Sequence, residues 1–376
     1  MPVGVFFEEV SGTAEERLLA LDIVRELPAG PQARTRRTAM HQSRLMGVIA
    51  GLVLGASAVA AAAQTPTVKL TLDFSIQGQQ SPFVLAAEGG YFAREGVNVQ
   101  VDRGYGSADA ITKVASGAYE MAFADIGALI QFNGRQNEAK AVSVFQIYDV
   151  APMVVLSLRK ASITKPSDLA GKRIASPTGA SSRVMFPLFA RANGLDPSSV
   201  HWLDVTPQLR EILLVQGQTD ATTALITDVA GLEHLGITED DLNVMRYSDF
   251  GVALYGHCLL TTPQFADRNP DAVQKVVKGA AEAWKAAIAN PDAAIAALKK
   301  REPLIEEKVE RARLDLVIKN AILTERVRRD GLGAVDPARM ARTINMIAET
   351  FKLPALAIQS IYRSDYLPPQ AELQLN

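Results

Sequence analysis

The residues best suited to bind a ligand stand in loops that follow apolar, alternating segments. Residues 68–74 alternate apolar and polar side chains, which predicts a β-strand, and they lead into a polar loop at 77–81. A glycine-rich loop at 104–107 follows a second such segment, and Asp125 ends a third. Strands alternating with helices predict a parallel sheet with right-handed crossovers, which binds ligands outside the carboxyl ends of its strands. We therefore expect the three loops to meet at one edge.

Two loops rich in glycine and hydroxyl groups could each hold an anion. The loop 104–107 opens a predicted helix, whose free N–H groups and dipole suit a carboxylate, sulfonate or nitrate. The loop 178–182 is its counterpart in the second half of the chain. Each could instead be a plain glycine turn with a capping serine, and the sequence leaves both interpretations open.

Carboxylate and aromatic side chains near these loops are further candidates. Asp73 and Asp125 end two predicted strands, where they would bind an amine or ring N–H of a ligand, or cap the following loop. Aromatic rings could stack on a planar ligand, although most are expected in the core. The predicted ligand-binding residues are Asp73, Phe74, Gln77, Gln79, Gln80, Phe83, Tyr105, Gly106, Ser107, Asp125, Tyr148, Thr178, Gly179, Ser181 and Tyr255.

Catalytic, metal and cofactor motifs are absent from the sequence. The four histidines are too scattered for a metal motif, and there is no nucleophile elbow and no Walker loop. We therefore expect no catalytic residue, no metal and no cofactor, although sites can assemble from distant residues. The net charge of −2 gives no support for a nucleic-acid partner. The single cysteine, Cys258, excludes an intrachain disulfide.

The segment pattern predicts an α/β fold with two lobes. A second α/β series begins near residue 173, and the chain turns to helix from 263 onward. Crossings near 151–159 and 254–261 would form a two-segment hinge, with the helical C-terminal part packed on the first lobe. The expected boundaries are 64–155 with 257–376 for lobe 1, and 156–256 for lobe 2. A cleft between lobes is a favoured site for a small ligand.

The N-terminus carries the features of an export signal. Residues 45–63 are uncharged and end in small residues, and arginines precede them. This pattern predicts a signal peptide at 40–63, cleaved after Ala63, and a periplasmic location. The alternative is a membrane anchor, since this length can just span a bilayer. Residues 1–39 fit no export pattern, so we interpret them as a mis-called extension with Met40 as the true start.

Several motifs resemble one family. They are Asp73-Phe74, GYFAREGVNV at 90–99, Gly106-Ser107, ASGAYEMAFAD at 115–125 and SDLAGK at 167–172. They are similar to the periplasmic solute-binding proteins of ABC transporters for nitrate, sulfonates, taurine and thiamine-pyrimidine precursors, over roughly residues 68–368. The resemblance implies the type II periplasmic binding protein fold. The first loop departs from the pyrimidine-binding branch, which usually has a tryptophan and an asparagine there, and the cysteine-rich motif of the related synthases is missing.

The resemblance also implies a function. The chain would be the periplasmic substrate-binding component of an ABC importer, a monomer that captures a small anion or heteroaromatic solute by closure of two lobes and delivers it to the membrane permease. One alternative is an enzyme on the same fold, such as a pyrimidine-precursor synthase or a menaquinone-pathway lyase. The signal peptide speaks against an enzyme, because those substrates are cytoplasmic. The other alternative is a periplasmic ligand sensor subunit.

Overall fold

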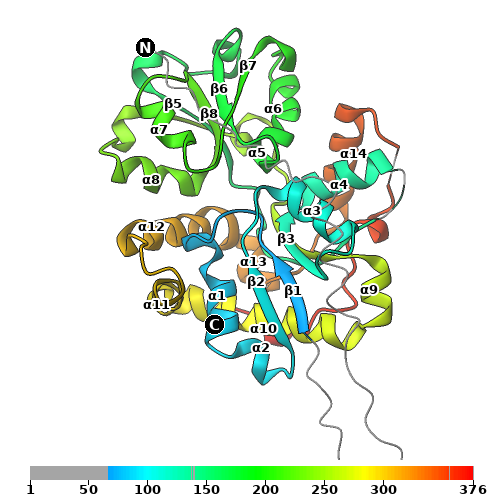
Figure 1. Cartoon of the computed structure of the whole chain (residues 1–376). Coiled ribbons are helices and arrows are strands. Elements are labelled where there is room, and N and C mark those ends of the chain that lie inside the picture. Colours follow the sequence, from blue (N-terminus) through cyan, green and yellow to red (C-terminus); the bar gives the residue numbers. More distant parts are fainter. Residues whose placement is uncertain (1–66, 137, 139, 355, 376) are drawn as a thin grey trace, which may run out of the picture. The chain divides into compact units, whose positions relative to one another are not determined.

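The computed structural model describes residues 67–375 except 137, 139 and 355. The predicted extension (1–39) and signal peptide (40–63) lie outside the described residues. The described chain forms two α/β lobes, each built on a five-stranded sheet (Figure 1). The prediction of two α/β lobes is therefore confirmed.

The first sheet has the strand order β2-β1-β3-β10-β4. Its strands are β1 (Thr67–Thr71), β2 (Asn98–Asp102), β3 (Met121–Asp125), β4 (Val142–Gln146) and β10 (His257–Thr261). The second sheet has the order β7-β6-β8-β5-β9. Its strands are β5 (Met153–Leu158), β6 (Arg173–Ser176), β7 (His201–Asp204), β8 (Ala221–Leu225) and β9 (Leu242–Arg246).

Each sheet adds one antiparallel strand to the parallel strands that the sequence predicted. β10 runs antiparallel to both β3 and β4, and β5 runs antiparallel to both β8 and β9. These two are the first strands that the chain makes after crossing between lobes. The parallel strands of each sheet run toward the other lobe. A strand that enters from that side must therefore run the opposite way.

Helices cover both sheets. In the first lobe they are α1 (Ser81–Glu88), α2 (Tyr91–Arg94), α3 (Ser107–Ala115) and α4 (Ile126–Gln136). The second lobe has α5 (Ser181–Val184), α6 (Phe186–Ala192), α7 (Arg210–Val215) and α8 (Val229–His234). The C-terminal part has α9 (Pro263–Arg268), α10 (Pro270–Ala289), α11 (Pro291–Arg301), α12 (Glu307–Val317), α13 (Glu325–Asp330), α14 (Pro337–Phe351) and α15 (Gln370–Leu373).

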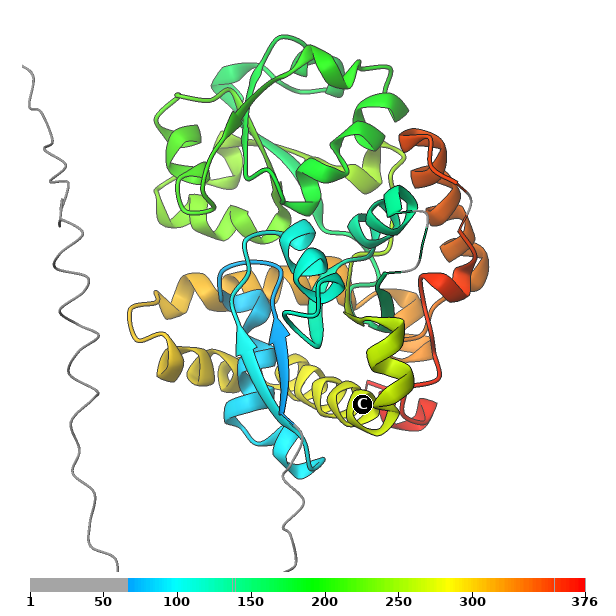
Figure 2. The ribbon, with the colours of Figure 1, turned by 45° about the vertical axis from the view of Figure 1, so that its right-hand side comes forward.

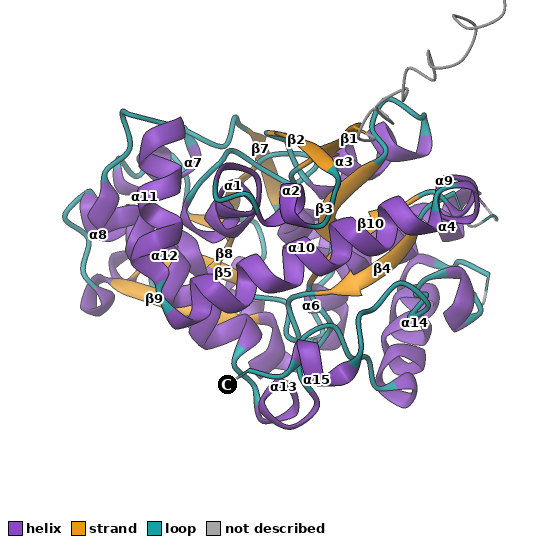
Figure 3. Cartoon of the chain, turned by 90° about the horizontal axis from the view of Figure 1, so that it is seen from below, coloured by secondary structure: helices purple, strands orange, loops and turns teal. Residues whose placement is uncertain are grey.

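The C-terminal helices pack mainly on the first lobe, as predicted. α10 is amphipathic, and its buried Trp284 contacts Phe83 and Tyr148 edge-on at ring distances of 5.9 Å. Figure 3 shows α10 and α11 beside α1. Two helices also reach the second lobe: α12 contacts α8, and α14 lies against α6 as well as α4 (Figure 2). Within residues 67–375, apart from the three left out, no helix is both long and apolar enough to cross a membrane.

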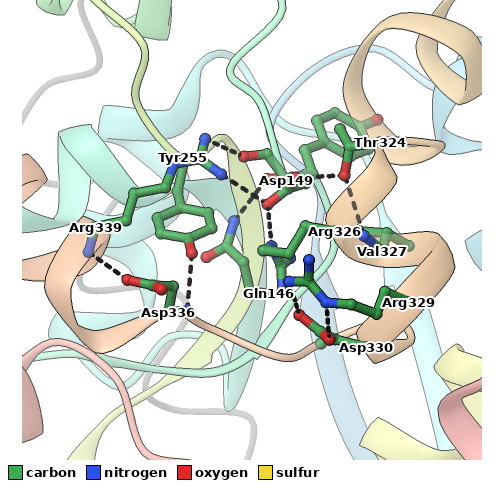
Figure 4. A network of polar contacts seen from close by, with 12 residues as sticks. Gln146, Asp149, Tyr255, Thr324, Arg326, Val327, Arg329, Asp330, Asp336 and Arg339 are labelled. Carbon is green, nitrogen blue, oxygen red and sulfur yellow. Dashed lines mark hydrogen bonds and ion pairs between the residues drawn. The ribbon is translucent and has the colours of Figure 1, made fainter.

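The two crossings are tied together by polar contacts centred on Asp149 (Figure 4). The Asp149 carboxylate accepts bonds from Thr324 Oγ1 at 2.5 Å, Arg326 Nε at 2.7 Å and Arg339 Nη1 at 2.9 Å. The Arg339 guanidinium also donates to the backbone oxygens of Asp149 and Leu254 and stacks 4.0 Å over the Tyr255 ring. One arginine of α14 thus contacts both crossings.

Candidate functional site

A cavity lies between the lobes, where the carboxyl ends of both sets of parallel strands meet. About 350 Å³ between these residues is not filled by protein atoms, part of it open to solvent, and only about 20 Å³ is free for the centre of a water-sized sphere, so the cavity is narrow. The first lobe contributes Asp73, Phe74, Gln79, Gln80, Gly106 and Ser107. The second lobe contributes Ala180, Ser181, Ser182, Arg210, Leu225 and Asp228.

Asp73 is held by two side chains of its own lobe. Its Oδ1 accepts a bond from Gln80 Nε2 at 3.0 Å, and its Oδ2 lies 3.0 Å from Nε2 of the buried His257. Burial disfavours the imidazolium, but the carboxylates of Asp73 and Asp125 outweigh that effect and raise the pKa of His257. On its first-lobe side the cavity therefore has the Asp73 carboxylate in a fixed orientation. Behind it lies the His257 imidazole, whose pKa is raised.

Two buried polar atoms of cavity residues have no partner among the described residues. One is Oε1 of Gln79, whose Nε2 donates to Gln77 Oε1 at 3.0 Å. The other is Nε of Arg210. Both side chains are at most 4% exposed. A buried polar group without a partner is costly, so a ligand that offers a donor to Gln79 and an acceptor to Arg210 would be favoured.

The second-lobe side carries an ionic cluster, which we call the lobe-bridging cluster. Arg210 Nη2 lies 2.6 Å from Asp228 Oδ2, and Arg313 of α12 lies 3.1 Å from Asp228 Oδ1. Glu211 and Glu310 complete the cluster at 3.6–3.7 Å from the guanidinium groups. Burial raises the pKa of both glutamates, while Arg313 lowers it. The cluster joins residues of both lobes beside the cavity.

The glycine loop of the first lobe meets the second lobe directly. Gly106 has φ 131°, a conformation that favours glycine, and its N–H donates to the backbone oxygen of Asp73 at 2.7 Å. The N–H of Ala108, in the first turn of α3, donates to the backbone oxygen of Gly179 at 3.3 Å. A protein carbonyl thus binds part of the helix N-terminus that the sequence suggested for an anion.

The comparisons with known proteins identify the family. Residues 77–294, more than half of the chain, match the family model described as NMT1/THI5 like. This chain belongs to the NMT1/THI5 like family. A formylaminopyrimidine-binding protein from Halalkalibacterium halodurans is 26% identical over 260 residues, which cover 67% of this chain and 77% of that protein.

Solved structures show the type II periplasmic binding protein fold. A protein from Bordetella bronchiseptica RB50 has a TM-score of 0.66 at 19% identity, covering 80% of this chain and 95% of that one. The periplasmic aliphatic sulphonate binding protein SsuA from Escherichia coli has a TM-score of 0.60 at 17% identity, covering 79% and 92%. The resemblance and fold predicted from the motifs are therefore confirmed.

In this NMT1/THI5 like chain, part of the predicted site reaches the cavity. Asp73, Phe74, Gln79, Gln80, Gly106, Ser107 and Ser181 line it. Gln77 and Gly179 stand just behind, since Gln77 binds Gln79 and Gly179 contacts α3. Thr178 is exposed and bonds to Asp204 at 3.2 Å, and Tyr105 is 58% exposed beside Arg103.

The remaining four predicted residues are also not brought to the cavity. Phe83 and Tyr148 are core residues that pack around Trp284 and Phe123. Asp125 is buried and its Oδ1 accepts from Ala128 N at 2.9 Å, which caps α4, and burial raises its pKa. Tyr255 lies in the hinge under Arg339. Large aromatic rings fill cores well, so their presence near the loops did not indicate ligand contact.

Two charged residues of the second lobe, Arg210 and Asp228, line the cavity and were not among the predicted residues. Asp228 follows β8 at its carboxyl end, so the rule that selected Asp73 could have found it. Arg210 and Arg313 gave no signal of this kind, because Asp228, the carboxylate that they share, is distant from both in sequence. Within the described residues, no group of three or more histidine, cysteine or acidic side chains could hold a metal ion.

Proposed function

We propose that this chain is the substrate-binding component of an ABC importer, and that its solute is a small nitrogen heterocycle of the aminopyrimidine class. The observation that carries the proposal is the excess of acceptors in the cavity. The cavity has three side chains that accept hydrogen bonds, namely Asp73, Asp228 and Gln79 through its unpartnered Oε1. It has one positively charged donor, the guanidinium of Arg210. A carboxylate oxygen can accept more than one bond, so an amino group and ring N–H would find partners.

The same acceptors disfavour an anionic solute. Sulfonate or nitrate would lie beside two carboxylates in a largely buried cavity, where like charges repel strongly, and Arg210 is already paired with Asp228 at 2.6 Å. The Phe74 ring lines the cavity and could stack on a planar heterocycle. The 26% identical relative is named for binding a formylaminopyrimidine, which supports the pyrimidine class over the sulfonates.

We infer that the protein binds its solute without converting it. The strongest general-base candidate, His257, is fully buried and does not line the cavity. Cys258 is equally buried, and burial raises the pKa of its thiol to about 12, which disfavours the thiolate. Neither side chain is placed to attack a bound ligand.

Native mass spectrometry tests the ligand class. Purified protein is incubated with an equimolar mixture of a formylaminopyrimidine, 4-aminopyrimidine, an alkanesulfonate, taurine and nitrate. We expect a mass shift for the pyrimidines, with the solute recovered unchanged. Retention of the sulfonate or nitrate alone would contradict the proposed class, and a converted product would contradict the binding role.

The periplasmic location is part of the proposal. The apolar run before Gln64 predicts export with cleavage after Ala63. N-terminal sequencing of protein from a periplasmic extract should start at about Gln64. Uncleaved protein confined to the membrane fraction would contradict export as a free binding protein.

A further inference from the structure

Helix α12 packs on the first lobe but presents Arg313 to the second. Its Leu314 and Val317 belong to the first-lobe core, and Glu310 accepts the N–H of Gly78 in the loop that precedes α1. Arg313 points the other way: Nη1 lies 3.1 Å from Asp228 Oδ1 and 3.3 Å from the backbone oxygen of Thr227. Figure 1 shows α12 beneath α8.

Asp228 is thereby held between two arginines from different lobes. Arg210 of its own lobe takes one carboxylate oxygen and Arg313 takes the other, and all three residues are at most 4% exposed. Buried charges of this kind depend on their partners. The Arg313 bond joins elements of opposite lobes, so it breaks when the lobes separate, whereas the Arg210 bond lies within one lobe.

Gly231 of α8 has no side chain, and this leaves room for Arg313 to reach Asp228 and Glu211. A Cβ at Gly231 would overlap Glu211 Oε2 and Arg313 Nη2. Both atoms are ends of long side chains, so an alanine there would displace the ion pair without a backbone clash. Alanine also favours a helix over glycine. Gly231→Ala should therefore stabilise helix α8 and at the same time weaken the contact between Arg313 and Asp228.

We propose that Arg313 is a positioning residue of the ligand site, which couples closure of the lobes to the arrangement of Asp228 and Arg210 in the cavity. The part of this inference that concerns affinity rests on the proposed function. The part that concerns closure does not, because it follows from the contacts between α12 and the second lobe.

Spin labels on the two lobes test closure. Leu235 at the end of α8 and Leu304 before α12 are 42% and 97% exposed, so Leu235→Cys and Leu304→Cys accept labels, whereas the native Cys258 is buried. Label distances are measured with and without a formylaminopyrimidine. The labelled protein that is otherwise wild type should show a population with a short distance between the labels, which corresponds to closed lobes. In Arg313→Gln and Gly231→Ala the ratio of short to long distances should fall about tenfold or more.

Two further variants make the result specific. Arg311→Gln removes the same charge from the same helix, but Arg311 pairs with Asp292 and Asp315 of the C-terminal helices, so closure should match wild type. The double variant Glu310→Gln with Arg313→Gln keeps the net charge of the cluster but still lacks the contact with Asp228. Its lobes should therefore remain separated. This variant tests the inference even if Arg313→Gln alone folds poorly.

Affinity provides the second measurement. The formylaminopyrimidine should bind Arg313→Gln about 10- to 100-fold more weakly than Arg311→Gln, with Arg313→Lys between them because a lysine keeps one of the contacts. Label distances in Arg313→Gln that match those of wild type, both without solute and with it, would overturn the inference. Normal closure behaviour without pyrimidine binding would instead refute only the proposed ligand.

Discussion

Asp73 is the residue with the most direct predicted role in ligand recognition. It lines the cavity, and Gln80 and His257 fix its two oxygens. Asp73→Asn replaces one acceptor oxygen by a donor, so it should weaken pyrimidine binding by about 10- to 100-fold. Calorimetry measures the change. Asp102→Asn is the matched control, because Asp102 ends the neighbouring strand β2 and does not line the cavity; equal losses in both variants would contradict the role of Asp73.

His257 should make stability depend on pH. Burial disfavours its charged form, but Asp73 and Asp125 outweigh this and raise its pKa in the folded protein. The ion-pair stabilisation is then fully present below about pH 6.5, the unfolded value, and is lost as pH rises through the folded pKa. Urea unfolding from pH 6 to 9 should show wild type losing stability relative to His257→Gln. Parallel curves for the two proteins would show that His257 stays neutral.

At this scale the sequence predicted only part of the site. Asp73, Gln79 and Gln80 were found because a strand end is a reliable place for ligand groups. Arg210 and Arg313 were not, because they acquire their role from Asp228, which is 18 and 85 residues away in the chain. Phe83 and Tyr148 were selected for their chemistry, and packing against Trp284 placed them in the core.

At the scale of elements, the loop before α3 is predicted to control closure. A Cβ at Gly106 would overlap the backbone of Gly179 in the second lobe, and φ is 131°. A side chain at this position would therefore keep the lobes apart. Gly106→Ala should raise the radius of gyration in small-angle scattering with saturating pyrimidine and weaken binding.

Gly117→Ala is the control for backbone strain. Gly117 also has a positive φ, 77°, but no atom lies within 4 Å of its Cβ position. This variant should lose some stability and still close and bind normally. Normal closure of Gly106→Ala would contradict the steric account of the loop.

The hinge depends on α14 and on the start of α13 with its capping residue Thr324. Asp149 is 2% exposed and binds Thr324, Arg326 and Arg339. Asp149→Ala leaves two partly buried guanidinium groups without their counter-charge, which should cost about 3–5 kcal/mol of unfolding free energy at most. Chemical denaturation measures this loss. Asp330→Ala removes a carboxylate from the exposed pair with Arg329 and should have little effect; comparable losses would contradict a special role for the hinge network.

The elements themselves were largely predictable, and their directions were not. The strands predicted at 68–74 and 119–125 are present in shorter form, as β1 (Thr67–Thr71) and β3 (Met121–Asp125). β5 and β10 look like any apolar segment, so nothing local indicates that they run antiparallel. Their direction follows from the crossings, which are a property of the whole chain.

For the whole molecule, the family motifs carried the prediction furthest. They indicated the fold because GYFAREGVNV and SDLAGK mark entries into α/β units. They did not indicate the solute, since specificity comes from side chains that two lobes bring together. The same limit applies to α12 and α14. Both belong to the C-terminal helical part that was predicted to pack on the first lobe, yet each also contacts the second lobe.

The central claim is that the closed cavity binds an aminopyrimidine-class solute in preference to an anion. Calorimetric titration of the purified protein with a formylaminopyrimidine and, in parallel, with an alkanesulfonate tests it most directly. The acceptor-rich lining predicts saturable one-to-one binding of the pyrimidine and at least about a hundredfold weaker binding of the sulfonate, which is about 2.7 kcal/mol. Saturable binding of the sulfonate with no heat from the pyrimidine would contradict the account.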